Sequence, residues 1–299
     1  MDKQELFKKI SNELENKLHL LDDKPEETII STINALWFKA AGIPISAERA
    51  VNLSLPDLTE NQINYLSELI QMRVENTPLA YITGRQNFMD VELLTDRRAL
   101  IPRKETELLG KKALQLSREL SDPDKKIYVM DVCCGSGNLG ITVAYYNPNC
   151  LVFASDISQE AIDLTLENIN FLNLNQRVSA NQGDMMAAYD KDEYLGKFDL
   201  IICNPPYISS SKVQKMDLEI SMNEPMAAFD GGMLGIKIIQ KLVHDGPKFL
   251  RTAGWMVFEV GLGQGQLIHQ LCERTQLFSQ IKTVLDGSDN IRVISVQKS

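Results

Sequence analysis

The chain has 299 residues, of which 44% are hydrophobic and 24% are charged, with a formal net charge of −9 and a pI of about 5.0. This length predicts two domains, and the acidic balance argues against a protein whose main affinity is for nucleic-acid phosphates. The start of the chain has no apolar signal core and no run approaches a membrane span, so we expect a cytoplasmic protein.

Residues 1–85 predict a small helical bundle. Leucine and isoleucine recur at helical spacing in two stretches, 6–21 and 29–37. Ser46 is expected to cap a short helix over 47–53. This region contains no cluster of residues suited to catalysis, so we expect it to recognise a partner.

Residues 86–102 favour a β-hairpin or an extended linker, and residues 103–299 alternate between strands and helices. Strands are expected at 128–131, 151–156, 178–180, 198–203, 255–258, 281–285 and 291–296, and helices at 139–146, 158–174, 233–250 and 264–274. The alternation predicts an α/β fold with a doubly wound, mainly parallel sheet. Two consecutive strands at the end predict an antiparallel final strand.

The tetrapeptide Asn204-Pro205-Pro206-Tyr207 directly follows the apolar run 198–203. Two consecutive prolines cannot donate to a sheet, so the strand must end in a rigid turn. In open α/β sheets ligands bind at this edge. The N–H groups of a planar nitrogen could bond to the Asn204 side-chain oxygen and the Pro205 carbonyl, with Tyr207 packed on its face. All four are candidate substrate-binding residues, and the catalytic candidates are Asn204, Pro205 and Tyr207.

Acidic residues and a glycine-rich turn are expected at the ends of the three preceding strands. The turn after Asp131 contains Gly135 and Gly137, which permit close approach of a ligand to the backbone. Asp156 can accept both hydroxyls of a ribose, and Asp184 can accept from an adenine amine. The candidate cofactor-binding residues are Asp131, Cys133, Cys134, Gly135, Ser136, Gly137, Asp156, Asp184, Met185 and Asn204.

This pattern suggests a nucleoside cofactor whose reactive end lies at Asn204. S-adenosylmethionine fits better than a dinucleotide, because it has no pyrophosphate to cradle and its sulfonium is compatible with nearby carboxylates and carbonyls. The chain has five cysteines and three histidines but no Cys-x-x-Cys pair, so no metal site is expected. Cys133 and Cys134 are interpreted as small loop residues, with a redox pair as the alternative.

Three further segments carry a family resemblance. Residues 77–84, 100–107 and 224–232 read Thr-Pro-Leu-Ala-Tyr-Ile-Thr-Gly, Leu-Ile-Pro-Arg-Lys-Glu-Thr-Glu and Glu-Pro-Met-Ala-Ala-Phe-Asp-Gly-Gly. With Asn204–Tyr207 they resemble the PrmC/HemK family, bacterial methyltransferases that modify the glutamine amide of peptide chain release factors. The resemblance implies a Rossmann-like methyltransferase domain. It also implies methyl transfer from S-adenosylmethionine to the glutamine of a Gly-Gly-Gln loop in translation termination.

The tetrapeptide alone is shared with enzymes that methylate amino groups of adenine or guanine, and the segments around Tyr81, Arg103 and Glu224 favour the protein-glutamine branch. Two residues depart from the family pattern: Cys133 replaces a glycine and Lys104 replaces a proline. A cysteine is accommodated without strain if φ is negative there. The open alternatives are a nucleic-acid amino methyltransferase, a non-catalytic cofactor-binding paralogue and, more weakly, a dehydrogenase.

Overall fold

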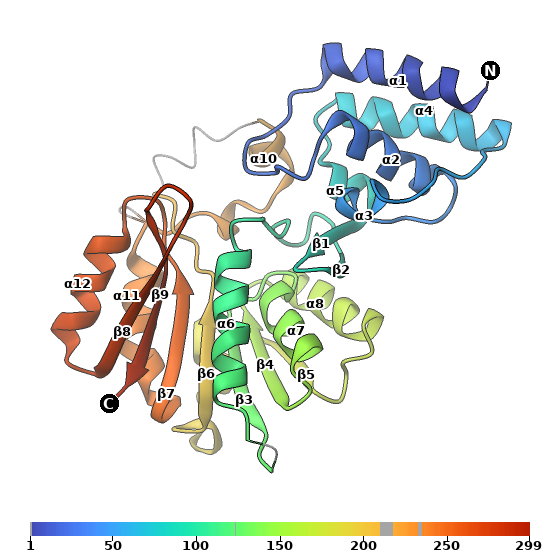
Figure 1. The fold of residues 1–299 in the computed structure, drawn as a ribbon. Coiled ribbons are helices and arrows are strands. Elements are labelled where there is room, and N and C mark those ends of the chain that lie inside the picture. The colour runs from blue at the N-terminus through green and yellow to red at the C-terminus, as the bar shows by residue number, and fades with distance from the viewer. Residues whose placement is uncertain (1, 123, 210–217, 233–234) are drawn as a thin grey trace. The chain divides into compact units, whose positions relative to one another are not determined.

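The computed structural model describes residues 2–122, 124–209, 218–232 and 235–299. The chain forms two compact units, whose elements are labelled in Figure 1. The first unit comprises Met1–Arg97, Ile101–Lys104 and Asp217–Glu224, and the second comprises Arg98–Leu100, Glu105–Met216 and Pro225–Ser299. The N-terminal unit thus takes in two short segments from further along the chain.

The N-terminal unit is helical, with one small hairpin. Its elements are α1 (Lys3–Lys17), α2 (Ile29–Ala40), α3 (Ala47–Ala50), α4 (Glu60–Val74), α5 (Leu79–Thr83), β1 (Arg85–Phe88), β2 (Val91–Leu94) and α10 (Leu218–Asn223). Helix α2 is buried almost all round and packs against α1, α3, α4 and α5. An apolar helix of this kind belongs at the centre of a bundle. The predicted helical region with a following hairpin is therefore confirmed.

The predicted cap at Ser46 was only partly right. Ser46 does precede α3, but its hydroxyl donates to the Glu92 carboxylate at 2.7 Å and accepts no hydrogen bond from the backbone N–H groups of the helix. The helix ends at Ala50 instead of reaching residue 53. The Ser46 side chain therefore bonds to Glu92 on the hairpin instead of capping α3 as the local sequence had predicted.

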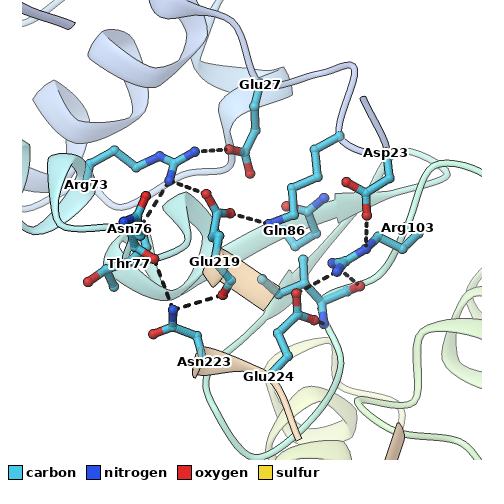
Figure 2. A network of polar contacts seen from close by, with 12 residues as sticks. Asp23, Glu27, Arg73, Asn76, Thr77, Gln86, Arg103, Glu219, Asn223 and Glu224 are labelled. Carbon is cyan, nitrogen blue, oxygen red and sulfur yellow. Dashed lines mark hydrogen bonds and ion pairs between the residues drawn. The ribbon is translucent and has the colours of Figure 1, made fainter. Parts of the chain in front are cut away.

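Helix α10 lies where the sequence predicted only a loop. Its Glu219 carboxylate accepts a hydrogen bond from Lys24 Nζ at 2.6 Å. It accepts another from Arg73 Nη1 at 2.6 Å (Figure 2). Arg73 also donates to Glu27 at 2.9 Å. These four side chains are at most 4% exposed. Charges buried this deeply must be paired, so the ion pairs fix α10 within the helical unit.

A second buried group in the same unit is centred on Arg103. Its guanidinium donates to Asp23 at 2.9 Å and to Glu224 at 2.5 Å (Figure 2). The other oxygen of Glu224 accepts from the Ile101 backbone. Burial lowers the pKa of Arg103, but the two neighbouring carboxylates outweigh burial and raise it. Arg103 therefore joins the segment that follows α10 to the helical unit.

The second unit is a doubly wound α/β domain. Its main elements are α6 (Glu107–Glu119), β3 (Ile127–Val132), α7 (Asn138–Tyr146), β4 (Cys150–Asp156), α8 (Gln159–Phe171), β5 (Val178–Gln182), β6 (Phe198–Cys203), α11 (Lys237–Asp245), β7 (Leu250–Glu259), α12 (Gly265–Thr275), β8 (Phe278–Leu285) and β9 (Ile291–Lys298). Helices α6, α7 and α8 cover one face of the sheet, and α11 and α12 cover the other (Figure 1).

The sheet order is β5-β4-β3-β6-β7-β9-β8, and β9 runs antiparallel to both of its neighbours. This confirms the predicted mainly parallel sheet with an antiparallel last strand. The chain order reverses between β3 and β6, which pair in parallel with Val132 opposite Cys203. Such a switch point is where α/β sheets bind ligands. The glycine-rich turn and the proline corner therefore leave the sheet next to each other.

One helix was missed and two predicted boundaries were wrong. Helix α6 was not foreseen. The helix expected over 233–250 ends at Asp245 because Gly246 and Pro247 interrupt it; residues 233–234 lie outside the described part of the chain. Strand β7 already begins at Leu250. Across the described ranges, no helix has both the length and the apolar character to cross a membrane.

Candidate active site

The proline corner leaves β6, whose six residues are all buried. Pro205 is buried, whereas Asn204 and Tyr207 are half-buried. Asn204 Nδ2 donates to the Thr106 hydroxyl at 3.2 Å. Among the residues that the structure describes, none donates to Asn204 Oδ1 or to the Pro205 carbonyl. Both acceptors are thus left for a ligand.

Tyr207 is held at both ends. Its hydroxyl donates to Glu259 Oε1 at 2.8 Å, and its backbone carbonyl accepts from Gln264 Nε2 at 2.9 Å. Burial and the Glu259 charge raise the pKa of Tyr207 well above its usual range. The hydroxyl is therefore a neutral donor used inside the protein, and only the ring remains for contact with a substrate.

The chain after the corner is held by the glycine-rich end of the 224–232 segment. Ile208 N donates to Phe229 O at 3.0 Å, and Gly231 N donates to Ile208 O at 2.9 Å. A Cβ atom at Gly231 would lie 2.6 Å from the Pro206 carbonyl oxygen. Glycine is required there because any side chain would push the corner away.

Asp131 lies at the end region of β3 and is fully buried. Its Oδ2 accepts from Gly140 N at 2.8 Å, while Oδ1 is buried without a hydrogen-bond partner in the described part of the chain. Burial raises the pKa of Asp131 from 3.8 to about 7, against the lowering effect of the Gly140 bond. Asp131 therefore ties the first turn of α7 to the strand.

The glycine-rich turn requires positive φ at three positions: Cys133 (+59°), Gly135 (+56°) and Gly137 (+81°). The condition of negative φ at Cys133 is thus not met. A residue with a Cβ in the left-handed region costs about 1–2 kcal/mol relative to its normal conformation. The turn reverses the chain direction between β3 and α7. The backbone of Cys133 is therefore strained at a position where the family pattern has glycine. Cys134 is buried, and its neighbour Ser136 is also buried.

Asp156 ends β4 and is half-buried. Its Oδ2 accepts from Gly135 N at 2.9 Å and its Oδ1 accepts from Ser158 N at 3.0 Å. Each carboxylate oxygen keeps a further lone pair for a ligand. The next residue, Ile157, is 64% exposed, and this apolar side chain beside the carboxylate was not singled out in the sequence.

Asp184 lies beyond β5, which ends at Gln182, and is exposed. Its carboxylate accepts from Lys241 Nζ on α11 at 2.6 Å. Met185 is buried with φ +55°, and its carbonyl accepts from the Ser155 hydroxyl at 2.7 Å. The backbone around Met185 is therefore fixed to β4. The Asp184 carboxylate, in contrast, would have to break its ion pair with Lys241, or keep it while also accepting from a ligand.

Sequence reasoning missed three residues that support the corner: Thr106, Glu259 and Gln264. Glu259 is the last residue of β7, so the rule that identified Asp156 at a strand end would also have identified it. Thr106 and Gln264 lie just before helices and carry no such signal. Only the folded chain shows that they contact Asn204 and Tyr207.

In the helical unit, the three family-like segments meet. Arg103 bonds to Glu224, and both charges affect the pKa of Tyr81, which is raised mainly by burial and then by Glu224. Residues that are far apart in the chain therefore form one buried cluster. The proline corner belongs to the other unit.

The chain is similar in sequence to known methyltransferases. The family model "Methyltransferase small domain" matches residues 112–220. A release factor glutamine methyltransferase of Thermodesulfovibrio yellowstonii is 31% identical over 244 residues, covering 82% of this chain and 85% of that protein. One from Clostridium botulinum is 31% identical over 260 residues, covering 86% of this chain and 89% of that protein.

Among solved structures, the chain is similar to the N-terminal domain of human METTL16 in complex with SAH. The TM-score is 0.51 at 13% identity, with 77% of this chain and 82% of that chain covered. This likeness confirms the Rossmann-like methyltransferase fold.

Proposed function

Because the chain belongs to the release factor glutamine methyltransferase family, we propose that it transfers a methyl group from S-adenosylmethionine to a glutamine side-chain amide nitrogen in a peptide chain release factor. The observation that carries the proposal is the proline corner. Asn204 Oδ1 and the Pro205 carbonyl are two acceptors with no donor in the described part of the chain. They match the two N–H groups of a primary amide.

The residues around the glycine-rich turn fit the cofactor. A Cβ atom added to Gly135 would have open space around it, so the backbone of the turn is accessible. Asp156 has lone pairs left for ribose hydroxyls, and Ile157 offers an exposed apolar side chain beside it. When bound, the cofactor would supply an electrophilic methyl group on its sulfonium.

The proposed contacts follow the order of the strand ends. The turn would hold the cofactor tail, Asp156 its ribose, and Asp184 with Met185 its base. Asp131 would act through the turn that it fixes, since its side chain is fully buried. The proposed cofactor-binding set is Asp131, Cys133, Cys134, Gly135, Ser136, Gly137, Asp156, Asp184, Met185 and Asn204.

The chain's own residues have to overcome the low nucleophilicity of an amide nitrogen, whose lone pair is delocalised into its carbonyl group. Bonds from the two amide hydrogens to Asn204 and Pro205 would fix the amide plane. The same acceptors would stabilise positive charge that builds on the nitrogen, and the nitrogen would lose one of its two protons after the transfer. The ring of Tyr207 would pack on the amide face. This is catalysis by orientation and preorganised charge.

Incubation with labelled S-adenosylmethionine and a bacterial release factor tests the proposal. Label should enter the wild-type release factor and be absent from its Gln→Ala variant in the Gly-Gly-Gln loop, as located by mass. Label in RNA or DNA instead of protein would favour the nucleic-acid alternative. No calorimetric binding of the cofactor would favour a non-catalytic paralogue.

A further inference from the structure

The backbone of the proline corner has few groups by which it can be held. Pro205 and Pro206 have no backbone N–H, so neither residue can donate to a neighbouring segment. The Pro205 carbonyl has to stay open if it is to accept from a substrate. An anchor close to it must therefore be a donor that reaches another carbonyl of the corner. In the described part of the chain, the Tyr207 carbonyl accepts such a bond from the side chain of Gln264.

Gln264 uses both ends of its side-chain amide. Its Nε2 donates to the Tyr207 carbonyl at 2.9 Å and, at the longer distance of 3.4 Å, to the Gly235 carbonyl. Its Oε1 accepts from Gly261 N at 2.9 Å. Two carbonyls on one side and an N–H group on the other fix the direction of the amide. Gln264 therefore joins three segments: the corner, the turn before α11 and the loop after β7.

Two glycines make room for this amide. A Cβ atom at Gly235 would lie 2.1 Å from the Tyr207 carbonyl oxygen and 2.8 Å from Gln264 Nε2. A Cβ atom at Gly261 would lie 2.8 Å from Gln264 Oε1 and 3.0 Å from Tyr207 Cδ2. A side chain at either position would therefore displace the amide or Tyr207. The backbone on both sides of the amide thus fits it closely.

The backbone from which the Gln264 side chain projects is itself fixed. Gln264 is the N-cap residue of α12, yet its side chain caps none of the α12 residues that the structure describes. The next residue, Gly265, packs on β9 so closely that a Cβ atom there would lie 2.4 Å from Ile291 Cβ. The loop before it is also attached to β9, because Val260 N donates to Arg292 O at 2.9 Å. The amide therefore reaches the corner from a rigid base on the sheet.

We propose that Gln264 is a positioning residue for methyl transfer, which fixes the proline corner through the Tyr207 carbonyl. The inference rests on the proposed function of that corner. The rings of Pro205 and Pro206 hold φ at about −65°, so the corner moves as one stiff piece. Fixing its Tyr207 end therefore directs the Pro205 carbonyl and the Tyr207 ring toward the substrate amide.

The first test is Gln264→Met, which keeps the length of the side chain but removes its donors and its acceptor. We expect kcat with a release factor to fall about 10- to 100-fold, because a small displacement of a group that orients the substrate costs this much. The KM for the release factor should change less, since the loss concerns orientation in the transition state. The calorimetric affinity for S-adenosylmethionine should change little. An unchanged kcat overturns the inference.

Gln266→Met is the matched control. Gln266 lies on the same helix two positions further on and is exposed. The same substitution there should leave kcat at the wild-type value. An equal loss of kcat in both variants would show a general effect on α12 and would overturn the inference.

A measurement without turnover reports on the hydrogen bond itself. Carbon-13 in tyrosine carbonyls and nitrogen-15 in isoleucine amides isolate this carbonyl by nuclear magnetic resonance, since the sequence has two Tyr-Ile pairs, Tyr81–Ile82 and Tyr207–Ile208. In Gln264→Met the Tyr207 carbonyl resonance should move to lower chemical shift, because the carbonyl loses its donor. The Tyr81 resonance, from the helical unit, should stay in place. An unmoved Tyr207 resonance contradicts the inference even if the enzyme is active.

A second variant serves if Gln264→Met does not fold. Gln264→Glu, assayed at about pH 9 where a carboxyl group is ionised, keeps an acceptor for Gly261 N but offers no donor to Tyr207. The same loss of kcat and the same change in the Tyr207 resonance are expected, and wild-type values overturn the inference. A wild-type protein that leaves release factors unmethylated contradicts the proposed function instead. The Tyr207 resonance then still shows whether Gln264 holds the corner.

Discussion

At the level of single residues, the proposed chemistry depends on Asn204 and the direction of its amide. The side chain donates inward to Thr106 and leaves Oδ1 without a donor among the described residues. We predict that Asn204→Ala lowers the methylation rate more than about 100-fold, because a preorganised acceptor is lost. Cofactor binding by calorimetry should persist, since Asp156 and the glycine-rich turn are untouched. Near-normal turnover would rule out this mechanism.

Asp131 should make the stability of the ligand-free protein depend on pH. Its pKa is raised from 3.8 to about 7 in the folded chain, mainly by burial. Well below the unfolded pKa of 3.8, the group is protonated in both states. As the pH rises toward 7, the unfolded chain ionises first, so the folded state loses up to about 4 kcal/mol of relative stability.

The comparison with Asp131→Asn isolates this effect. The free energy of unfolding, measured in urea from about pH 4 to about pH 8, should fall more steeply with pH in the wild type than in the variant. Parallel curves would show that Asp131 does not carry this pKa shift.

At the level of elements, α10 is held by charge rather than by apolar packing alone. Glu219 pairs with Lys24 and Arg73, all nearly fully buried. Glu219→Ala would leave two cations without this partner, which typically costs 3–5 kcal/mol. We predict a loss of about that size in the free energy of unfolding and faster hydrogen exchange over 218–223.

An exposed ion pair provides the control. Lys17 pairs with Glu13 on the surface of α1, with Lys17 50% exposed. Lys17→Ala should change stability by no more than about 0.5 kcal/mol. If both variants lose the same small amount, the buried charges do not anchor α10.

At the level of the whole molecule, the two units are interleaved along the chain. The helical unit includes Ile101–Lys104 and the segment up to Glu224, and both return directly to the α/β unit. Thr106 lies three positions after Arg103, and Gly231 follows Glu224 closely. The groups that brace the proline corner are therefore covalently close to residues anchored in the helical unit.

We therefore predict that a chain starting at residue 98 loses methyl transfer to a release factor. Glu219 would lose Lys24 and Arg73, and Glu224 would lose Tyr81 as a neighbour, so residues 218–224 would no longer be fixed. Cofactor affinity should stay within about tenfold, because the turn and Asp156 belong to the other unit. Full activity of the shortened chain would show that the helical unit is dispensable.

The sequence by itself determined the fold class, the family and the order of the strand ends. Periodicity and two prolines suffice for the fold class and the strand ends, because strand alternation and the stop after Cys203 are local properties. The family followed from the resemblance of motif segments. The family segments around Tyr81, Arg103 and Glu224 were also readable without a structure.

Only the tertiary structure decided what holds those elements in place. Helix α10, the positive φ at Cys133 and the contact of Glu259 with Tyr207 were not predicted. Each depends on residues distant in the chain or on how the backbone turns between packed elements. The hydrogen-bond partner of a buried polar group depends on how deeply the group is buried and on the direction in which its side chain points. Neither property can be predicted from the neighbouring residues in the sequence.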